Sequence, residues 1–366
     1  MINKIIILGG GMVGSAIARD LQEAKHLVTI ADRDEGIQDR LERYGIDYIK
    51  LDFSELHAVA ESVKNYDLVV GAVPGFMGFE ILKTVLKSKK NIVDISFMQE
   101  DSRKLYSVAE KNGVTAITDA GIAPGLSNLI FGRVLSEFDR VDSAKCFVGG
   151  LPQNPRPPWL YKSVFSPLDV VEEYTRPARL VENGKIITKP AMTEIEPIEF
   201  IQIGVLDAFN SDGLRSLLDM PIPNMVEKTL RFPGHIQKII EMNNNGFFEP
   251  DKINETTKSL INEWKPCAED YDQTLLRLKF KGVKNGDNIT ETYNLIDYYD
   301  RRRNISSMAR TTGYTCTSIV NILLSEQFSK KGVFTMETLA SDSRLFDFII
   351  RYLSNRDVQF QNGTFQ

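Results

Sequence analysis

The sequence predicts an α/β fold in which a Rossmann-type, doubly wound parallel sheet is joined to an α+β domain with an open, mostly antiparallel sheet. Short apolar runs alternate with amphipathic helical patterns over roughly the first 120 residues. A glycine-rich turn separates the first run from the first helix, and a proline-rich, hairpin-forming region follows this half. We expect domains over residues 1–125 and 126–303, with C-terminal helices over residues 304–366.

The glycine-rich turn GGGMVG follows the apolar run KIIIL and precedes a helical pattern that ends in ARDL. In this setting Gly9 permits a tight turn, Gly11 lets the backbone approach a pyrophosphate, and Gly14 lets the helix pack on the strand. Met12 and Val13 open the helix, whose N-terminal N–H groups favour an anion. The turn therefore predicts a dinucleotide-binding cradle.

The second predicted strand, LVTIAD, ends in an acid about 20 residues after the glycine turn. A carboxylate at this point accepts hydrogen bonds from the adenosine ribose and repels a 2′-phosphate, so Asp32 favours NAD over NADP. Arg33 follows directly and would instead suit the phosphate of NADP. The sequence therefore predicts NAD as the cofactor and leaves NADP open.

Further strands of the same kind are predicted at 46–53, 67–74, 91–96 and 114–121. Ligands of a doubly wound sheet bind beyond the carboxyl ends of its strands, so the residues at these ends are candidates for the site. Those expected to line the cofactor are Asp52, Phe53, Ala72, Val73, Pro74, Asp94 and Ser96. Asp119, at the end of the last strand, is expected nearer the reacting groups.

The composition is that of an ordinary globular protein, with 366 residues, 42 % hydrophobic and 25 % charged. A formal charge of −5 argues against nucleic acid or an anionic membrane as the main partner. No run approaches the ~18 apolar residues of a membrane span. The three cysteines lie far apart without metal-ligand spacing, which predicts a cytoplasmic protein without a metal site.

After residue 140 the pattern changes. The segment at 149–167, GGLPQNPRPPWLYKSVFSP, is rich in proline and aromatic residues and predicts a loop or lid. Strand-like runs follow at 178–190 and 195–204, and two alternating runs around KNGD predict a hairpin. Helical patterns end the chain, in SSMARTTGYTCTSIVNILLSE and FDFIIRYLS.

Six motifs, taken together and in order, resemble the saccharopine dehydrogenase family, and most closely its lysine 6-dehydrogenase branch. They are GGGMVG, DAGIAPG, VGGLP with PRPPWLYKSVFSP, EIEPIEF, TLRFPGH and MARTTGYT. The resemblance implies a homodimer joined mainly through the second domain, with C-terminal helices that return to the first. It also implies NAD-dependent oxidation of the side-chain amine of L-lysine to an imine, which water converts to the semialdehyde and ammonia.

The reaction and the resemblance together suggest the residues around the substrate. The nicotinamide takes a hydride while the amine loses a proton, so a base is needed, and a cation must hold the carboxylate. Asp119 and His235 are the expected catalytic residues, with Tyr161, Lys162, Arg231, Arg310 and Thr311 at the substrate. Structural roles remain open for three of these features: Asp119 as a turn cap, His235 as a buried residue, and the cluster around Arg310 in helix packing.

Other functions remain open at this stage. Lys162 stands where lysine 6-dehydrogenases carry a neutral polar residue, and an extra cation would suit a more acidic substrate such as saccharopine. Saccharopine reductases usually carry a longer helical second domain, so the short chain favours lysine. An NADPH-dependent amine reductase that uses Arg33, and an NAD-binding protein without catalysis, are the remaining alternatives.

Overall fold

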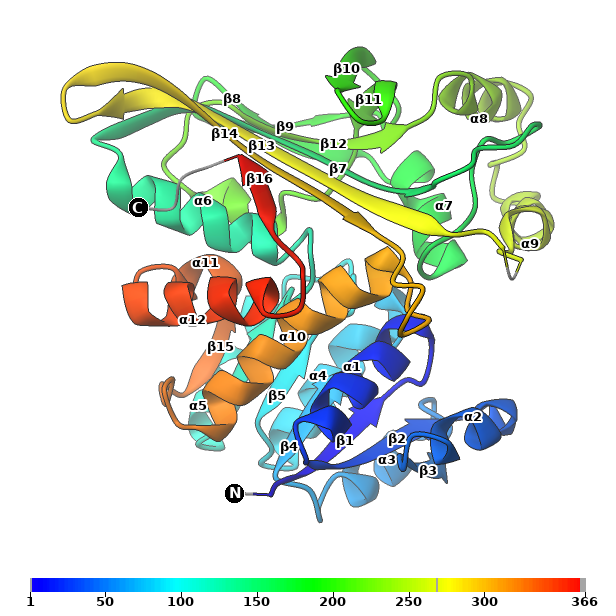
Figure 1. Cartoon of the computed structure of the whole chain (residues 1–366), viewed down its shortest axis with the longest axis vertical. Coiled ribbons are helices and arrows are strands. Elements are labelled where there is room, and N and C mark those ends of the chain that lie inside the picture. Colours follow the sequence, from blue (N-terminus) through cyan, green and yellow to red (C-terminus); the bar gives the residue numbers. More distant parts are fainter. Residues whose placement is uncertain (1, 268, 363–366) are drawn as a thin grey trace. The chain divides into compact units, whose positions relative to one another are not determined.

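The computed structural model describes residues 2–267 and 269–362, which form two compact units. The first unit contains the residues up to Arg133 and Ala309–Asp357, and the second contains Val134–Met308 and the residues from Val358. Each unit is built on its own sheet (Figure 1). The chain passes between the units within the helices α6 (Leu126–Glu137) and α10 (Ser307–Leu324), and again after Asp357.

The sheet of the first unit has the strand order of a Rossmann fold. Its strands are β1 (Lys4–Leu8), β2 (Leu27–Asp32), β3 (Asp47–Lys50), β4 (Leu68–Gly71), β5 (Ile92–Asp94), β6 (Thr115–Thr118) and β15 (Gly332–Thr335). All neighbours pair in parallel in the order β15-β6-β5-β4-β1-β2-β3. The reversal between β1 and β4 is the switch point at which such sheets bind ligands.

Helices connect these strands as the alternating pattern predicts. They are α1 (Met12–Glu23), α2 (Gln38–Glu42), α3 (Leu56–Ser62), α4 (Gly75–Lys87) and α5 (Tyr106–Lys111), with short 3₁₀ turns at Glu35–Ile37 and Ser102–Leu105. The central strand β1 is fully buried from Ile5 to Leu8, which explains its unbroken apolar sequence. Strands β1 and β2 coincide with the runs KIIIL and LVTIAD that predicted them. Strands β3 to β6 are shorter than their predicted runs, because the ends of those runs form the turns that follow the strands.

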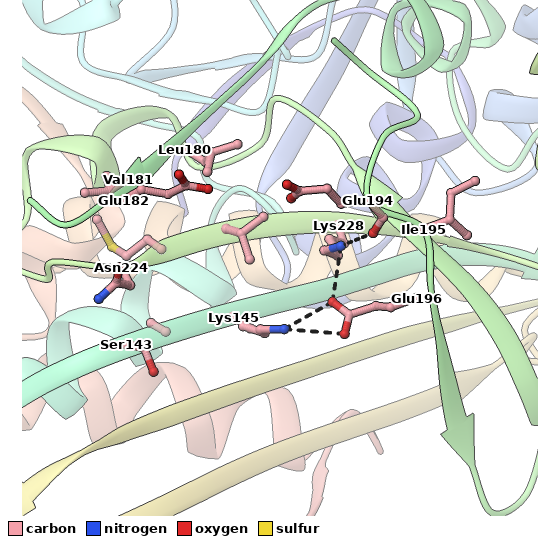
Figure 2. Close-up of a pocket in the computed structure, with 13 residues that line it drawn as sticks. Ser143, Lys145, Leu180, Val181, Glu182, Glu194, Ile195, Glu196, Asn224 and Lys228 are labelled. Atoms are coloured by element: carbon pink, nitrogen blue, oxygen red, sulfur yellow. Dashed lines mark hydrogen bonds and ion pairs between the residues drawn. The ribbon is translucent and has the colours of Figure 1, made fainter. Parts of the chain in front are cut away.

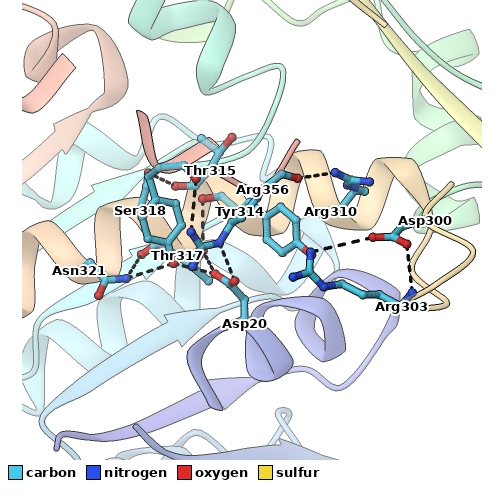
Figure 3. A network of polar contacts seen from close by, with 11 residues as sticks. Asp20, Asp300, Arg303, Arg310, Tyr314, Thr315, Thr317, Ser318, Asn321 and Arg356 are labelled. Carbon is cyan, nitrogen blue, oxygen red and sulfur yellow. Dashed lines mark hydrogen bonds and ion pairs between the residues drawn. The ribbon is translucent and has the colours of Figure 1, made fainter. Parts of the chain in front are cut away.

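The C-terminal helices of the first unit are fixed to α1 by the buried carboxylate of Asp20 (Figure 3). Its Oδ2 accepts hydrogen bonds from Thr317 of α10 at 2.6 Å and from Tyr352 of α12 (Ser343–Ser354) at 2.7 Å. Its Oδ1 accepts from Nε of Arg356 at 2.6 Å. A buried, charge-assisted network of this kind holds segments that are far apart in the sequence in one arrangement.

The second unit contains a mixed sheet in which nearly all neighbours are antiparallel. Its strands are β7 (Arg140–Pro152), β8 (Ala178–Glu182), β9 (Lys185–Lys189), β10 (Glu196–Phe200), β11 (Gly204–Asn210), β12 (Met225–Arg231), β13 (Asp272–Lys284), β14 (Asp287–Tyr298) and β16 (Phe360–Asn362). The main path runs β10-β11-β12-β7-β13-β14-β16, and only β12 and β7 pair in parallel among the pairs described. The predicted hairpin is β13–β14, whose two-residue turn places Asn285 and Gly286 at positive φ, as a type I′ turn requires.

Two sequence-based expectations for the second unit were wrong in detail. The residues 149–152 are not a loop: they end the long central strand β7, where Gly149 and Gly150 give room for the side chains of Leu230 and Val164. The strand-like runs at 178–190 and 195–204 each contain two strand segments separated by a turn, β8 and β9 in the first, and β10 and the start of β11 in the second. The helices of this unit are α7 (Pro167–Thr175), α8 (His235–Asn244) and α9 (Ile253–Trp264).

Candidate functional site

The glycine turn after β1 fits a dinucleotide cradle. Gly9 has a φ of +113°, and a Cβ built on it would lie 2.3 Å from the carbonyl oxygen of Ala72, so a side chain cannot replace its hydrogen. A Cβ on Gly14 would lie 2.0 Å from the carbonyl oxygen of Gly9, which shows how closely α1 packs on the strand. At Gly11 a Cβ would meet nothing within 4 Å. The open side of the turn therefore lies at the residue expected to approach the pyrophosphate.

The N-terminus of α1 is available to an anion. Gly11 is its N-cap and offers no side chain that could accept from the first N–H groups, while Met12 is 41 % exposed. Val13 is partly exposed. Uncapped N–H groups at a positive helix end are a suitable site for phosphate. The residues present thus fit the pyrophosphate of NAD or NADP.

Asp32 lies at the end of β2, beside this turn. Its Oδ2 accepts from the backbone N–H of Gly10 at 2.6 Å, and its Oδ1 accepts from that of Asp34 at 3.0 Å. The carboxylate therefore braces the glycine turn and keeps lone pairs for further donors. Arg33 is exposed. A second arginine that the sequence analysis missed, Arg40 of α2, donates to the carbonyl oxygen of Gly10 at 3.2 Å, and only the folded arrangement reveals its proximity.

The other predicted cofactor residues lie at the same edge but differ in exposure. Asp52 is exposed and caps its own turn by accepting from Ser54, whereas Phe53 is buried in the apolar core. Ala72 and Pro74 are partly exposed between β4 and α4, and Val73 is buried. The edge therefore offers Asp52, Ala72 and Pro74 to a ligand more readily than the two buried side chains.

Asp94, the last residue of β5, and Ser96, two residues later, are both buried. Asp94 has no exposed surface, and its Oδ1 accepts from the backbone N–H of Ser96 at 2.8 Å. A Cβ on Gly71 would lie 1.8 Å from Oδ2 of Asp94, so the carboxylate packs directly on β4. These contacts fix the turn after β5. A direct cofactor contact by either residue remains a prediction.

Asp119 lies in the turn that follows β6 and is 4 % exposed. Its φ is +54°, in the left-handed region that aspartate tolerates better than most residues. The turn continues through a cis peptide bond between Ala123 and Pro124 to the start of α6 at Leu126. Asp119 thus belongs to the carboxyl edge of the first sheet, as predicted, and its catalytic role remains a prediction.

In the second unit a buried polar cluster surrounds Arg231, the last residue of β12. Its guanidinium lies over the ring of Tyr161 at 4.5 Å and that of Tyr174 at 5.6 Å from the ring centroids. Its Nε donates to the hydroxyl of Tyr174 at 2.8 Å, and one terminal nitrogen forms an ion pair with Glu173 at 2.5 Å. Arg231 is 1 % exposed. Although burial disfavours its charge, Tyr174 and Glu173 keep its pKa above the usual value.

His235 belongs to the same cluster because the RFPG turn joins β12 directly to α8. Gly234, at φ +98°, allows the sharp change of direction, and His235 is the first residue of the helix. The imidazole has no exposed surface. Burial, and then the positive charge of Arg231, lower the pKa of His235 to about 3. The structure thus brings together Tyr161, Arg231 and His235, three of the predicted residues.

Two residues of this cluster were missed by the sequence analysis. Glu173 and Tyr174 lie on α7, a helix that begins at Pro167 behind the N-cap Ser166. The Ser-Pro pair at a helix start is a recognisable signal. The contacts with β12 depend on the folded arrangement and have no local pattern.

The other predicted substrate residues have contacts of their own. The ammonium of Lys162 donates to the carbonyl oxygens of Glu263 and Lys265, both at 3.1 Å, and so caps the C-terminus of α9. Arg310 and Thr311 belong to the first unit, where both are buried on α10. The guanidinium of Arg310 donates to the carbonyl oxygen of Arg356. Contacts of Lys162, Arg310 and Thr311 with the substrate remain predictions.

A second buried acid lies on β12. Glu227 is 5 % exposed, and it is hydrogen-bonded to the thiol of Cys146 on the neighbouring strand. Burial is the main cause that raises the pKa of Glu227 to about 8, and Glu173 and Asp212 add to the effect. A neutral carboxylic acid is therefore the form that this site favours at neutral pH.

A pocket of about 500 Å³ lies on the second unit, and none of the predicted site residues is among those that line it. Figure 2 shows Lys145 and Lys228 directed at the carboxylate of Glu196, with Nζ to Oε1 distances of 3.1 and 3.2 Å. Lys189 pairs with Glu182 and Glu194, which also line the pocket. The charges around it are therefore matched within the chain.

Two further findings concern the described residues as a whole. No group of three or more histidine, cysteine, aspartate or glutamate side chains within residues 2–267 and 269–362 is arranged to hold a metal ion. In the same ranges no helix combines the length and the apolar character that crossing a bilayer requires.

A parallel sheet with a dinucleotide cradle, joined to a separate unit with a largely antiparallel sheet, defines the class of two-domain NAD(P)-binding oxidoreductases. Sequence profiles narrow this class: the saccharopine dehydrogenase NADP binding domain matches residues 5–117, and the saccharopine dehydrogenase C-terminal domain matches residues 121–358. The chain belongs to the saccharopine dehydrogenase family. The family predicted from the six motifs is thereby confirmed, whereas its lysine 6-dehydrogenase branch is not.

Individual relatives are distant. The mitochondrial alpha-aminoadipic semialdehyde synthase of Mus musculus is 24 % identical over 268 residues, which are 69 % of this chain and 28 % of that protein. The NADP-dependent, L-glutamate-forming saccharopine dehydrogenase of Saccharomyces cerevisiae is 25 % identical over 294 residues, 73 % of this chain and 65 % of that protein. The chain thus spans less than a third of the mouse protein.

A solved structure confirms the fold. The apo L-Glu-forming saccharopine dehydrogenase of Saccharomyces cerevisiae superposes with a TM-score of 0.80 at 19 % sequence identity, over 98 % of this chain and 99 % of that one. The predicted fold class, a Rossmann domain followed by a second sheet domain, is therefore correct. The predicted homodimer and cytoplasmic location remain predictions.

Proposed function

We propose that the chain is an NAD-dependent dehydrogenase that oxidises L-lysine at its 6-amino group to 2-aminoadipate 6-semialdehyde, with release of ammonia. The observation that carries the proposal is the match of both domains of the saccharopine dehydrogenase family, in order, to a chain whose glycine turn fits a dinucleotide. The relatives' names refer to saccharopine and to aminoadipic semialdehyde. These names favour a lysine-derived amino acid as the substrate class.

The contacts of Lys162 favour lysine over saccharopine. The extra cation at this position is the feature that would suit a substrate with more carboxylates. Its ammonium, however, caps α9 through two carbonyl oxygens. Arg231 is the cation that the buried cluster contains, and Glu173 already offsets part of its charge. A substrate with a single carboxylate matches this balance better than saccharopine.

Bound NAD would supply the hydride acceptor for this reaction. Gly9, Gly11 and the N-terminus of α1 would hold its pyrophosphate, and Asp32 would accept from its adenosine ribose. Asp119 would take a proton from the substrate ammonium, so that the nitrogen lone pair can form the C=N bond as the hydride leaves carbon. Arg231 would hold the α-carboxylate. Water then adds to the imine, and ammonia leaves.

The preference for NAD rests on Asp32. A 2′-phosphate carries between about −1.5 and −2 charges at neutral pH, and a carboxylate held at this place repels it. The related fungal saccharopine dehydrogenases are named as NADP enzymes. The exposed Arg33 and Arg40 are the residues that would have to bind the phosphate if this chain resembles them in its cofactor.

A product assay tests the proposal. The purified chain is incubated with NAD or NADP and with L-lysine, saccharopine and a panel of other amines, and the reduced cofactor, ammonia and glutamate are measured. Ammonia formed from lysine with NAD is the expected result. Glutamate formed from saccharopine would instead assign the chain to the saccharopine branch. Cofactor binding without turnover of any amine would support a non-catalytic NAD-binding protein.

A further inference from the structure

The buried cluster around Arg231 contains a chain of hydrogen bonds whose direction can be determined. Nδ1 of His235 lies 2.7 Å from the carbonyl oxygen of Trp159. A carbonyl oxygen can only accept, so Nδ1 must carry the hydrogen. In a neutral imidazole Nε2 is then an acceptor, and it lies 2.9 Å from the hydroxyl of Tyr174. Tyr174 therefore donates to His235.

The next hydrogen bond in this series orients the guanidinium of Arg231. The hydroxyl oxygen of Tyr174 accepts from Nε of Arg231 at 2.8 Å. Each group thus donates to the next, from Arg231 through Tyr174 and His235 to the backbone of Trp159. A protonated imidazole would present a second donor to Tyr174 and leave the phenol hydrogen without this acceptor. It would also add a positive charge beside the buried Arg231. The arrangement therefore requires a neutral imidazole.

The guanidinium of Arg231 has N–H groups that these hydrogen bonds do not use. One terminal nitrogen donates to the carbonyl oxygen of Leu230 at 2.9 Å, and the other to Glu173 at 2.5 Å. With Nε these bonds occupy three of the five N–H groups of an arginine, counted over the residues that the structure describes. One N–H group on each terminal nitrogen is left. These two N–H groups, one from each terminal nitrogen, are donors that a substrate carboxylate can use.

We propose that His235 is a positioning residue: its neutral imidazole orients Tyr174, and through Tyr174 the plane of the Arg231 guanidinium, so that the two remaining N–H groups face the α-carboxylate of the substrate. The proposal rests on the function proposed above, in which Arg231 binds that carboxylate. It replaces the sequence-based expectation that His235 is a catalytic acid or base. Tyr174 and Glu173 join it as positioning residues.

The surroundings of His235 favour positioning over proton transfer. Both ring nitrogens are hydrogen-bonded within the chain, and the ring is enclosed by Trp159, Tyr161, Tyr174 and Trp264, whose centroids lie 5.1 to 6.5 Å away. A general base needs a nitrogen within reach of the proton that it removes. A fixed neutral acceptor needs only the geometry that is present.

Two substitutions at this position separate the roles of the two nitrogens. In His235→Gln the side-chain oxygen takes the place of Nε2 and still accepts from Tyr174. In His235→Asn the amide takes the place of Nδ1 and still donates to Trp159, but Tyr174 loses its acceptor. We expect His235→Asn to raise KM for lysine about tenfold more than His235→Gln, with Kd for NAD unchanged in both. Equal KM values in the two variants would overturn the proposal.

A matched control guards against a general loss of stability. Tyr174→Phe removes the hydroxyl group that links Arg231 to His235. Tyr293→Phe is the control, because it removes a hydroxyl group of the same unit that donates to Glu291 at 2.6 Å. We expect only Tyr174→Phe to raise KM, while both variants lower the melting temperature. A rise in KM of the same size in both variants would contradict the positioning role.

A spectroscopic test does not depend on turnover. The chain has only three histidines, so nitrogen NMR of the labelled wild-type protein can resolve the His235 ring. We expect the Nδ1–H tautomer from about pH 5 to about pH 8, with no titration near the ordinary histidine value. An Nε2–H tautomer, or a ring that protonates in this range, would overturn the inference. If instead the tautomer is as expected but the wild type neither binds nor oxidises an amino acid, the proposed function is wrong.

Discussion

The glycine turn of the first unit and the Arg231 cluster of the second differ in the groups that they offer to a charged ligand. In the glycine turn the binding groups are backbone N–H groups on an exposed helix start, and one residue, Gly11, faces open space. In the cluster they are side chains that are almost fully buried and bonded to one another. Binding and folding should therefore be separable in the turn and strongly coupled in the cluster.

The largest effect is expected when Arg231 is removed from the cluster. Arg231→Met leaves Glu173, whose side chain is 18 % exposed, without its partner. Breaking a fully buried pair costs about 3–5 kcal/mol of unfolding free energy, and the partial exposure of Glu173 places the expected cost toward the lower end of this range. The double variant Arg231→Met, Glu173→Gln removes both charges and should regain most of this stability, as measured by urea unfolding. We expect KM for lysine to stay at least about tenfold above the wild type in the double variant.

The double variant thus separates the two roles of Arg231. If the double variant has the KM of the wild type, Arg231 does not bind the substrate. Arg140, whose exposed ion pair with Asp142 has an N to O distance of 2.6 Å, provides the control. Because exposed pairs contribute little, Arg140→Met should change neither stability nor KM measurably.

The second prediction concerns the dependence of stability on pH. The pKa of Glu227 is about 8 in the folded chain and near 4.5 when unfolded, so the folded state binds the additional proton between these values. The resulting stability is fully present below about pH 4.5 and is lost as the pH rises through 8. Between these pH values the unfolding free energy should fall by up to about 1.4 kcal/mol per pH unit. Glu227→Gln should remove this slope while keeping an acceptor for Cys146.

Unfolding free energies of wild type and Glu227→Gln, measured from about pH 5 to about pH 9, check this prediction. The difference between the two curves isolates Glu227 from the other titrating groups. Parallel curves would mean that Glu227 is already ionised at neutral pH.

The third prediction uses the two glycines that differ most in their surroundings. Gly14→Ala places a methyl group against the carbonyl oxygen of Gly9 and should cost about 1–3 kcal/mol of stability. Gly11→Ala meets no atom within 4 Å, and its φ of −61° suits alanine, so stability should fall by less than about 1 kcal/mol. NAD affinity should nevertheless fall about tenfold, because the methyl group occupies the open side of the turn. Unchanged affinity in Gly11→Ala would place the pyrophosphate elsewhere.

This comparison also explains what the sequence could predict. The glycine turn, its helix and Asp32 lie within about 30 consecutive residues, and their spacing reflects one local requirement, the approach of a pyrophosphate to the backbone. The same holds for the β13–β14 hairpin, where Asn285 and Gly286 satisfy a turn type. Such features are encoded by neighbours in the chain.

The cluster was only partly predictable because its contacts join distant segments. The TLRFPGH motif pointed to Arg231 and His235, but nothing near them indicates that Glu173 and Tyr174 complete the cluster from α7. The same applies to Arg40 beside Gly10 and to Lys162 at the end of α9. The strand β7 was mistaken for a loop at its end because its two glycines serve packing rather than a turn. Burial and pairing of this kind have no local signal.

The smallest expected effect tests the choice of cofactor at Asp32. Its carboxylate accepts from the N–H groups of Gly10 and Asp34, and an asparagine oxygen can keep one of these bonds while the negative charge is lost. Asp32→Asn should therefore lower stability by about 1 kcal/mol through the lost hydrogen bond, and shift the ratio of NADP to NAD affinity by about tenfold, or about 1.4 kcal/mol, toward NADP. Calorimetric titration of both cofactors measures this ratio directly. Adding Arg33→Ala to Asp32→Asn should reverse much of the gain in NADP affinity, since the guanidinium is the group that would bind the 2′-phosphate. A wild-type protein that binds NADP as tightly as NAD would show that Asp32 serves only to brace the glycine turn.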